Sequence, residues 1–123
     1  MPRRLSESAR DHEGGFARVA SLDELPEGAL LGVVTSSGER VCLLNDHGVV
    51  LAVGDECPHQ GFALSSGELI GDGTIECVWH GARFDCRSGA VLRGPADAPL
   101  PRYAARVVGD DVLVGPRIVG NAR

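Results

Sequence analysis

Two short segments of the sequence carry the side chains best suited to hold a metal. Residues 57–61 read CPHQG and residues 77–81 read CVWHG, so each segment offers one Cys and one His. The combined pattern is C-x-H, a spacer of seventeen residues, and C-x-x-H. Thiolate and imidazole together select zinc or an iron–sulfur centre over hard cations. The candidate metal ligands are therefore Cys57, His59, Cys77 and His80.

The distribution of the four ligands helps to separate these two kinds of centre. A zinc finger usually places two Cys in one segment and two His in the other. Here each segment holds one of each, which suits two adjacent iron ions if one takes both Cys and the other takes both His. That is the ligand division of a Rieske [2Fe–2S] centre. A structural zinc site and a chance arrangement of unrelated Cys and His are the alternatives.

The sequence resembles the Rieske family beyond these ligands, from about Val49 to Val114. The matching features are Leu51-Ala52-Val53 before the first segment, Phe84-Asp85, the turn at Gly89 and the Pro-rich loop 94–101 before Tyr103. The resemblance implies one [2Fe–2S] cluster per chain, bound by Cys57, His59, Cys77 and His80. In that family such a Pro-rich loop covers one side of the cluster.

The remaining Cys and His residues have plainer interpretations. Cys42 lies in an apolar run and Cys86 ends another, so both are predicted to be buried core residues, and a contact between them is left open. His12 falls in a polar terminal stretch and His47 in a turn, so both are predicted to lie on the surface. In a reducing compartment, metal ligation explains four Cys better than two disulfides do.

Short apolar runs separated by turn signals predict an all-β, Rieske-type fold. Its antiparallel base, a small barrel or sandwich, has runs at 16–20, 29–35, 40–44, 49–53, 103–108 and 112–114. A cluster-binding β subdomain, about 54–101, is inserted with runs at 68–70, 74–78, 82–86 and 90–93. A capping box from Ser21 to Glu24 predicts one helical turn. The predicted divisions are a polar N-terminal tail (1–15), one Rieske domain (16–115) and a C-terminal tail (116–123).

Composition narrows the class of protein further. The net charge is −5, from 17 acids against 12 bases that are all Arg, and this acidic balance argues against nucleic acid as a partner. No apolar run approaches the roughly 18 residues that would cross a bilayer. Polar residues follow Arg3-Arg4 where a secretory signal would need an apolar stretch. We therefore expect a cytoplasmic protein that does not contact a membrane, and we expect a monomer.

Departures from the high-potential members of the family predict a low reduction potential. Where those proteins place a disulfide beside the cluster, this sequence has Phe62 and Trp79. Where they place Ser and Tyr hydroxyls, it has Ala82 and Phe84. Fewer hydrogen bonds to sulfur stabilise the reduced cluster less, so the potential should lie low in the Rieske range, on the order of −150 mV. The resemblance is thus to the soluble bacterial ferredoxins of aromatic-ring-hydroxylating oxygenase systems.

The predicted role is to carry electrons, not to act as an enzyme. After His80 only 43 residues remain and none is His, so we expect no mononuclear-iron domain of a Rieske oxygenase. No nucleotide loop or nucleophile–base pair is evident. The resemblance implies one-electron transfer from a ferredoxin reductase that uses FAD and NAD(P)H to a terminal Rieske oxygenase. The alternatives are the small subunit of an NAD(P)H-dependent nitrite reductase and a non-redox interaction module stapled by zinc.

Docking is predicted at the edge of the cluster that the two His ligands form. The residues expected around it are all uncharged: Pro58, Gln60, Gly61, Trp79, Gly81 and Ala82. The stretch 55–97 has seven acids and three bases, which gives a net charge of −4. These acids are expected to surround the neutral patch, where their charge would speed encounter with a partner.

Overall fold

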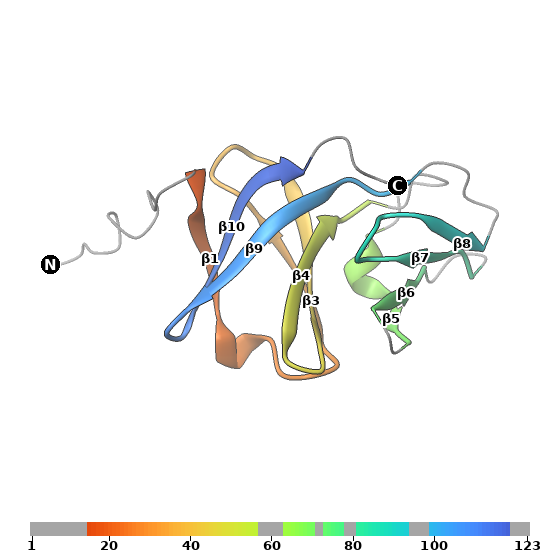
Figure 1. Ribbon diagram of the computed structural model, residues 1–123, viewed down its shortest axis with the longest axis horizontal. Helices are drawn as coiled ribbons and strands as arrows, with labels where there is room; N and C mark the ends of the chain where they lie inside the picture. The colour runs from red at the N-terminus through yellow and green to blue at the C-terminus, as the bar shows by residue number, and fades with distance from the viewer. Residues whose placement is uncertain (1–14, 57–62, 71–72, 78–80, 94–98, 119–123) are drawn as a thin grey trace, which may run out of the picture.

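The computed structural model describes residues 15–56, 63–70, 73–77, 81–93 and 99–118, which form two antiparallel sheets side by side (Figure 1). The larger sheet has the order β1-β10-β9-β4-β3-β2, with bounds Ala17–Ser21, Asp111–Ile118, Arg102–Val108, Val49–Gly54, Arg40–Asp46 and Leu30–Val34. The smaller sheet has the order β5-β6-β7-β8, with bounds Glu68–Leu69, Thr74–Glu76, Arg83–Asp85 and Val91–Arg93. The predicted all-β class is confirmed. None of the helical turns in these ranges is long and apolar enough to cross a membrane.

The smaller sheet is an insertion in the larger one. Strand β4 pairs with β9, where Ala52 lies opposite Tyr103 and Val53 opposite Arg102. The chain therefore leaves the large sheet at Gly54, builds the small sheet, and returns to pair beside the strand that it left. This is the inserted arrangement that the sequence predicts.

The large sheet curls on itself and encloses a core of its own. Its two edge strands, β1 and β2, contact each other, so the sheet is nearly closed. We call its interior the barrel core, which comprises Ala20, Leu25, Val41, Leu43, Ala52, Tyr103, Val112 and Val114. Leu25 enters this core just after the 3₁₀ turn Leu22–Glu24, where the backbone N–H of Ser21 donates to Glu24 Oε1 at 2.9 Å. That bond confirms the predicted single turn and its capping glutamate.

A second core lies between the two sheets. We call it the junction core, which comprises Cys42, Leu44, Val53, Leu64, Ile75, Cys77, Ala82, Phe84, Cys86 and Leu100. One face of the small sheet points into it, because four residues in register across the four strands contact it: Leu69, Ile75, Phe84 and Val91. The short 3₁₀ turn Leu64–Ser66 adds Leu64 from the segment before β5.

Strand β3 is buried on both faces. Val41 and Leu43 enter the barrel core, whereas Cys42 and Leu44 enter the junction core. Successive side chains of a strand point to opposite faces, so a strand between two cores reads as a continuous apolar run. The run from Val41 to Leu44 has this physical origin.

Several predicted strand ends shift in the structure. Strand β3 runs to Asp46 instead of ending at Leu44, so the turn contracts to His47 and Gly48, which both adopt positive φ values of 56° and 93°. Paired positive φ values suit the right-handed twist of the hairpin that they close. Strand β10 continues to Ile118, and the small-sheet strands are each shorter than their apolar runs. The turn Leu64–Ser66 was not predicted at all.

Candidate metal centre

Of the four candidate ligands, Cys77 lies within the described residues, whereas Cys57, His59 and His80 lie outside them. Cys77 directly follows β6 and is 1% exposed. Its backbone N–H donates to the carbonyl oxygen of Ala82 at 2.7 Å. This bond closes the base of the second ligand segment, so the chain turns back on itself within five residues.

A pocket of about 360 Å³ opens beside Cys77. Its other lining residues within the described ranges are Ser66, Gly67, Glu68, Glu76 and Gly81. A Cβ atom at Gly67 would lie 2.1 Å from the carbonyl oxygen of Glu76, so only glycine permits this close backbone approach. Gly81 has a φ of +70°, which also favours glycine. A buried thiol beside a pocket where Gly67 and Gly81 leave space at the backbone fits a thiolate-ligated iron–sulfur group.

The first ligand segment is flanked by a buried carboxylate. Asp55 directly follows β4 and is 6% exposed. Its Oδ1 accepts the backbone N–H of Ser65 at 2.7 Å, and its Oδ2 accepts the Ser65 hydroxyl at 2.7 Å. Asp55 was expected to be one of the surface acids around the docking patch, and its burial shows that this expectation was wrong. No local pattern marks the pairing, because the two residues are ten positions apart.

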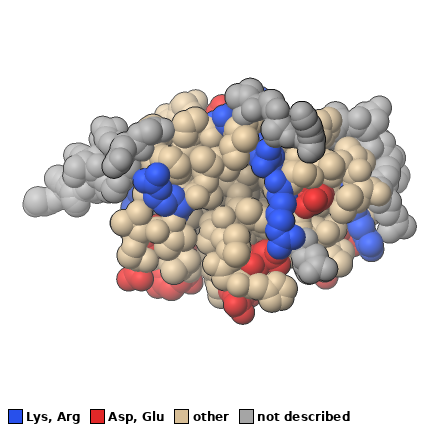
Figure 2. Space-filling model, in the orientation of Figure 1, with Lys and Arg blue, Asp and Glu red and all other residues tan. Residues whose placement is uncertain are grey.

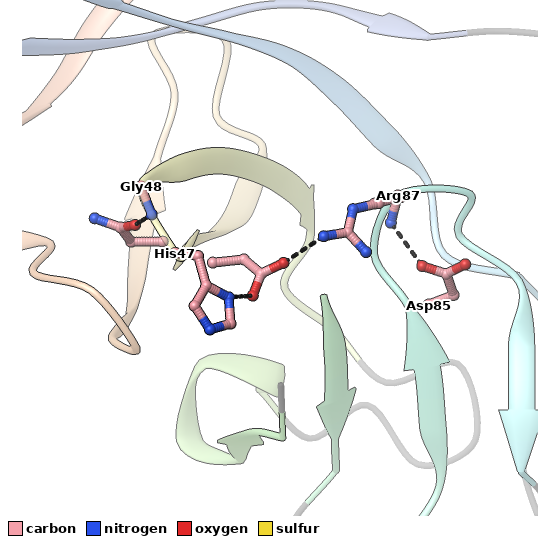
Figure 3. Close-up of polar contacts among 6 residues, drawn as sticks. His47, Gly48, Asp85 and Arg87 are labelled. Carbon is pink, nitrogen blue, oxygen red and sulfur yellow. Dashed lines mark hydrogen bonds and ion pairs between the residues drawn. The ribbon is translucent and has the colours of Figure 1, made fainter. Parts of the chain in front are cut away.

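A second buried carboxylate joins the two sheets (Figure 3). Asp46, at the end of β3, has a side chain that is 1% exposed. Its Oδ2 accepts Arg87 Nη2 at 2.6 Å, and its Oδ1 lies 2.9 Å from His47 Nδ1. Arg87 belongs to the turn between β7 and β8, where its own N–H donates to Asp85 Oδ1 at 3.0 Å. The carboxylate therefore ties β3 of the large sheet to the turn between β7 and β8 of the small one.

The interpretations of the other cysteines are confirmed. Cys42 and Cys86 are 0% and 2% exposed in the junction core, and both are free thiols. Burial raises the pKa of the Cys86 thiol to about 12, helped by the nearby carboxylates of Asp85 and Asp46. Burial also raises the pKa of Cys42 far above its usual range, helped by Asp55. Both groups therefore remain protonated at neutral pH, where a thiol is a poor metal ligand and a poor nucleophile.

The predicted docking patch is corrected at one position. Ala82 is 0% exposed in the junction core, so it cannot contact a partner. Gly81 is partly exposed, whereas Pro58, Gln60, Gly61 and Trp79 lie outside the described residues. One of the counted acids, Glu76, is paired with a counted base, since its Oε2 lies 3.2 Å from Arg83 Nε. Figure 2 shows basic and acidic side chains together on the face that it presents.

The surface prediction for His47 is confirmed, since its side chain is 77% exposed. His12 lies outside the described residues. Of the residues that stand in place of the hydroxyls and of the disulfide of high-potential proteins, the structure describes the first two. Phe84 and Ala82 are both fully buried in the core that includes Cys77, whereas Phe62 and Trp79 lie outside the described residues.

Comparison with known proteins gives a consistent set of relatives. A family model described as the Rieske [2Fe-2S] domain matches residues 15–104. The biphenyl dioxygenase ferredoxin subunit of Pseudomonas sp. (strain KKS102) is 35% identical over 99 residues, covering 80% of this chain and 90% of that protein. The 3-phenylpropionate/cinnamic acid dioxygenase ferredoxin subunit of Escherichia coli (strain K12) is 36% identical over 91 residues, covering 74% and 84%.

Solved structures give the same picture. The ferredoxin of carbazole 1,9a-dioxygenase from Nocardioides aromaticivorans IC177 matches with a TM-score of 0.77 and 33% identity, over 83% of this chain and 98% of that one. A carbazole 1,9a-dioxygenase complex of reduced oxygenase and oxidized ferredoxin matches at 0.78 with 25% identity, over 87% and 99%. A protein described as the small subunit of an NADH-dependent nitrite reductase from Mycobacterium tuberculosis matches at 0.73 with 27% identity, over 86% and 96%.

Proposed function

Because this chain belongs to the Rieske [2Fe-2S] domain family and carries one such cluster, we propose that it is the ferredoxin component of a multicomponent dioxygenase. Its task is to take one electron from a reductase and deliver it to a terminal oxygenase. The observation that carries this proposal is its similarity, over most of both chains, to ferredoxin subunits of aromatic dioxygenases. A partner is thus inferred by analogy with the ferredoxin that forms a complex with its oxygenase.

We assign the cluster to Cys57, His59, Cys77 and His80. The two thiolates would hold one iron and the two imidazoles the other, so each ligand segment would supply one ligand to each iron. The bound cluster supplies one-electron redox chemistry. The chain itself supplies the buried thiol of Cys77, the turn that its N–H closes with Ala82, and the apolar core against which the thiol packs.

The donor to this protein is proposed to be a ferredoxin reductase that holds FAD and oxidises NAD(P)H. The flavin accepts a pair of electrons as hydride and releases them one at a time, which suits a one-electron carrier. We propose that the protein works as a cytoplasmic monomer, because a carrier must leave one partner to reach the next. Transfer between the purified protein and a candidate reductase tests this step through NAD(P)H-dependent bleaching of the cluster.

The cluster itself is tested by composition and spectroscopy. We expect red-brown protein with about two irons and two labile sulfides per chain. The reduced protein should show the low average g-value that His ligation of one iron produces. His59→Ala and His80→Ala should lose this cluster, whereas the control His47→Ala, at an exposed position outside the ligand set, should keep it. Protein made with ample iron that contains zinc in stoichiometric amount and no iron would refute the proposal.

A second candidate is a subunit of a nitrite reductase, and the match to the small subunit from Mycobacterium tuberculosis favours it. Such a subunit would remain bound to a large partner. Gel filtration of the protein purified from its natural source decides between the two. A carrier should elute as a small protein, and its electron transfer should slow as salt rises, because screening acts over about 10 Å at 0.1 M. Elution with a large partner at high salt would favour the subunit.

A further inference from the structure

The two ligand segments are closed at their bases by different kinds of bond. The second segment closes through the backbone, from the N–H of Cys77 to the carbonyl of Ala82. The first segment lies within the longer stretch 55–65, and among the described residues the two ends of this stretch are joined through the carboxylate of Asp55. Both oxygens of this carboxylate are used, one on the N–H and one on the hydroxyl of Ser65, each at 2.7 Å.

Each end of this bridge is fixed to the fold. The N–H of Asp55 donates to the carbonyl of Arg40 on β3 at 3.0 Å. Ser65 lies in the turn Leu64–Ser66, whose first residue is 0% exposed in the junction core. The Asp55–Ser65 pair thus joins two anchored points. A buried carboxylate costs free energy unless donors satisfy it, and Ser65 supplies two of them.

The large sheet leaves room for this pair at one glycine. A Cβ atom at Gly32 of β2 would lie 2.7 Å from Ser65 Oγ and 2.8 Å from Asp55 Oδ2. A larger residue would displace one or both of these side chains, because a Cβ atom closer than 3.0 Å forces its neighbour to shift. Strand β2 therefore packs directly against the pair.

We propose that Asp55 and Ser65 are positioning residues for the first ligand segment. Their bonds hold together the two ends of the stretch that contains Cys57 and His59, so that these ligands need less ordering when they bind the cluster. Holding the ends lowers the conformational entropy that binding must overcome. Neither residue touches iron in this proposal, which rests on the ligand assignment given under the proposed function.

The test compares four variants with one matched control. Asp55→Ala removes both bonds, Ser65→Ala removes the hydroxyl bond, and Gly32→Ala displaces one or both side chains of the pair. Asp55→Asn should rescue the arrangement, since an amide oxygen can accept the Ser65 N–H while its NH₂ donates to the hydroxyl oxygen. The control Asp46→Ala removes a carboxylate of similar burial that contacts neither end of the segment.

The measurements are the rate of cluster loss, followed by visible absorption, and the g-values of the reduced cluster. Asp55→Ala should lose the cluster about tenfold faster than wild type, in line with other residues that support metal ligands. Ser65→Ala and Gly32→Ala should show smaller increases, Asp55→Asn should stay close to wild type, and the g-values should shift in Asp55→Ala. Asp46→Ala should lower the free energy of unfolding and leave the g-values unchanged.

The outcomes distinguish failure of the positioning role from failure of the proposed function. Wild-type loss rates and g-values in both Asp55→Ala and Ser65→Ala would overturn the positioning role. Because Ser65→Ala keeps the carboxylate in place, it gives an answer even where Asp55→Ala accumulates poorly. A shift of the g-values in Asp46→Ala equal to that in Asp55→Ala would also overturn it. Wild-type protein without iron would instead overturn the proposed function.

Discussion

The two sheets of this protein differ in the length of their strands and in the cores that they line. Strands of the large sheet have five to eight residues, whereas strands of the small sheet have two or three. The barrel core is lined by the large sheet and its own turn, but the junction core is shared. A sheet of such short strands is marginal without packing against another element. The large sheet should therefore be the stable platform, and the small sheet should depend on β3, on Arg87 and on the cluster.

The largest expected effects come from truncating one side chain in each core. Among the residues that the structure describes, Phe84 is the largest fully buried side chain and lies in the junction core, and Leu25 is a fully buried leucine of the barrel core. Phe84→Ala should cost about 3–5 kcal/mol and Leu25→Ala about 2–5 kcal/mol of unfolding free energy. Denaturant titration measures both. Phe84→Ala should also lower the iron content, and an equal loss of iron in Leu25→Ala would contradict the division between the two regions.

Removal of the cluster should affect the two sheets unequally. Because metal binding contributes directly to the stability of the elements that hold the metal, apoprotein should open locally in the small sheet. We expect amide exchange at Ile75 and Phe84 to accelerate by roughly a hundredfold, about 3 kcal/mol of local stability. Exchange at Leu43 and Val112 should change little. Uniform acceleration across both sheets would show that they unfold as one unit.

The ion pair between the sheets should respond asymmetrically to mutation. Arg87→Ala leaves the Asp46 carboxylate, 1% exposed, with His47 as its remaining partner among the described side chains, which should cost about 2–3 kcal/mol. Asp46→Ala leaves a guanidinium that is 53% exposed in contact with water, so about 1 kcal/mol is expected. Urea midpoints of the two variants test the order. A larger loss in Asp46→Ala would mean that the carboxylate stabilises the turn more than the junction.

The effect expected only in alkaline solution, with none at neutral pH, concerns the buried thiols of the junction core. Folding raises the pKa of Cys86 from a usual value of 9.0 to about 12, and that of Cys42 rises as well. Above pH 9 the folded state then holds more protons than the unfolded state, so stability falls as pH rises. Each thiol should contribute a slope approaching −1.4 kcal/mol per pH unit in that window. Cys86→Ala should flatten the alkaline decline measured by denaturant titration, and an unchanged slope would contradict the assignment.

The sequence predicts features that depend on neighbouring residues better than features that depend on contacts between distant ones. The apolar runs and turn residues predicted each strand that the structure describes, because both signals depend only on residues that are close in sequence. The Cys and His spacing identified the cluster for the same reason. Asp55 and Ala82 were misjudged, because the burial of Asp55 depends on its pairing with Ser65, and that of Ala82 on the junction core, which forms only after the sheets have packed together. An acidic residue is therefore predicted to lie on the surface unless the hydrogen-bond donor that satisfies it, which can be distant in sequence, is known.

The double burial of β3 leaves this strand without an amphipathic pattern to fix its alignment. A slip by one residue would exchange its two apolar faces at little hydrophobic cost, whereas in an ordinary strand it would expose the core side chains. Two polar residues at the end of β3 remove this ambiguity. Asn45 donates through Nδ2 to the carbonyl of Leu25 at 2.8 Å on one side, and Asp46 accepts Arg87 on the other. After a slip by one residue, Asn45 and Asp46 would each face the opposite core, away from these partners. The two residues therefore fix the register of β3 in the large sheet.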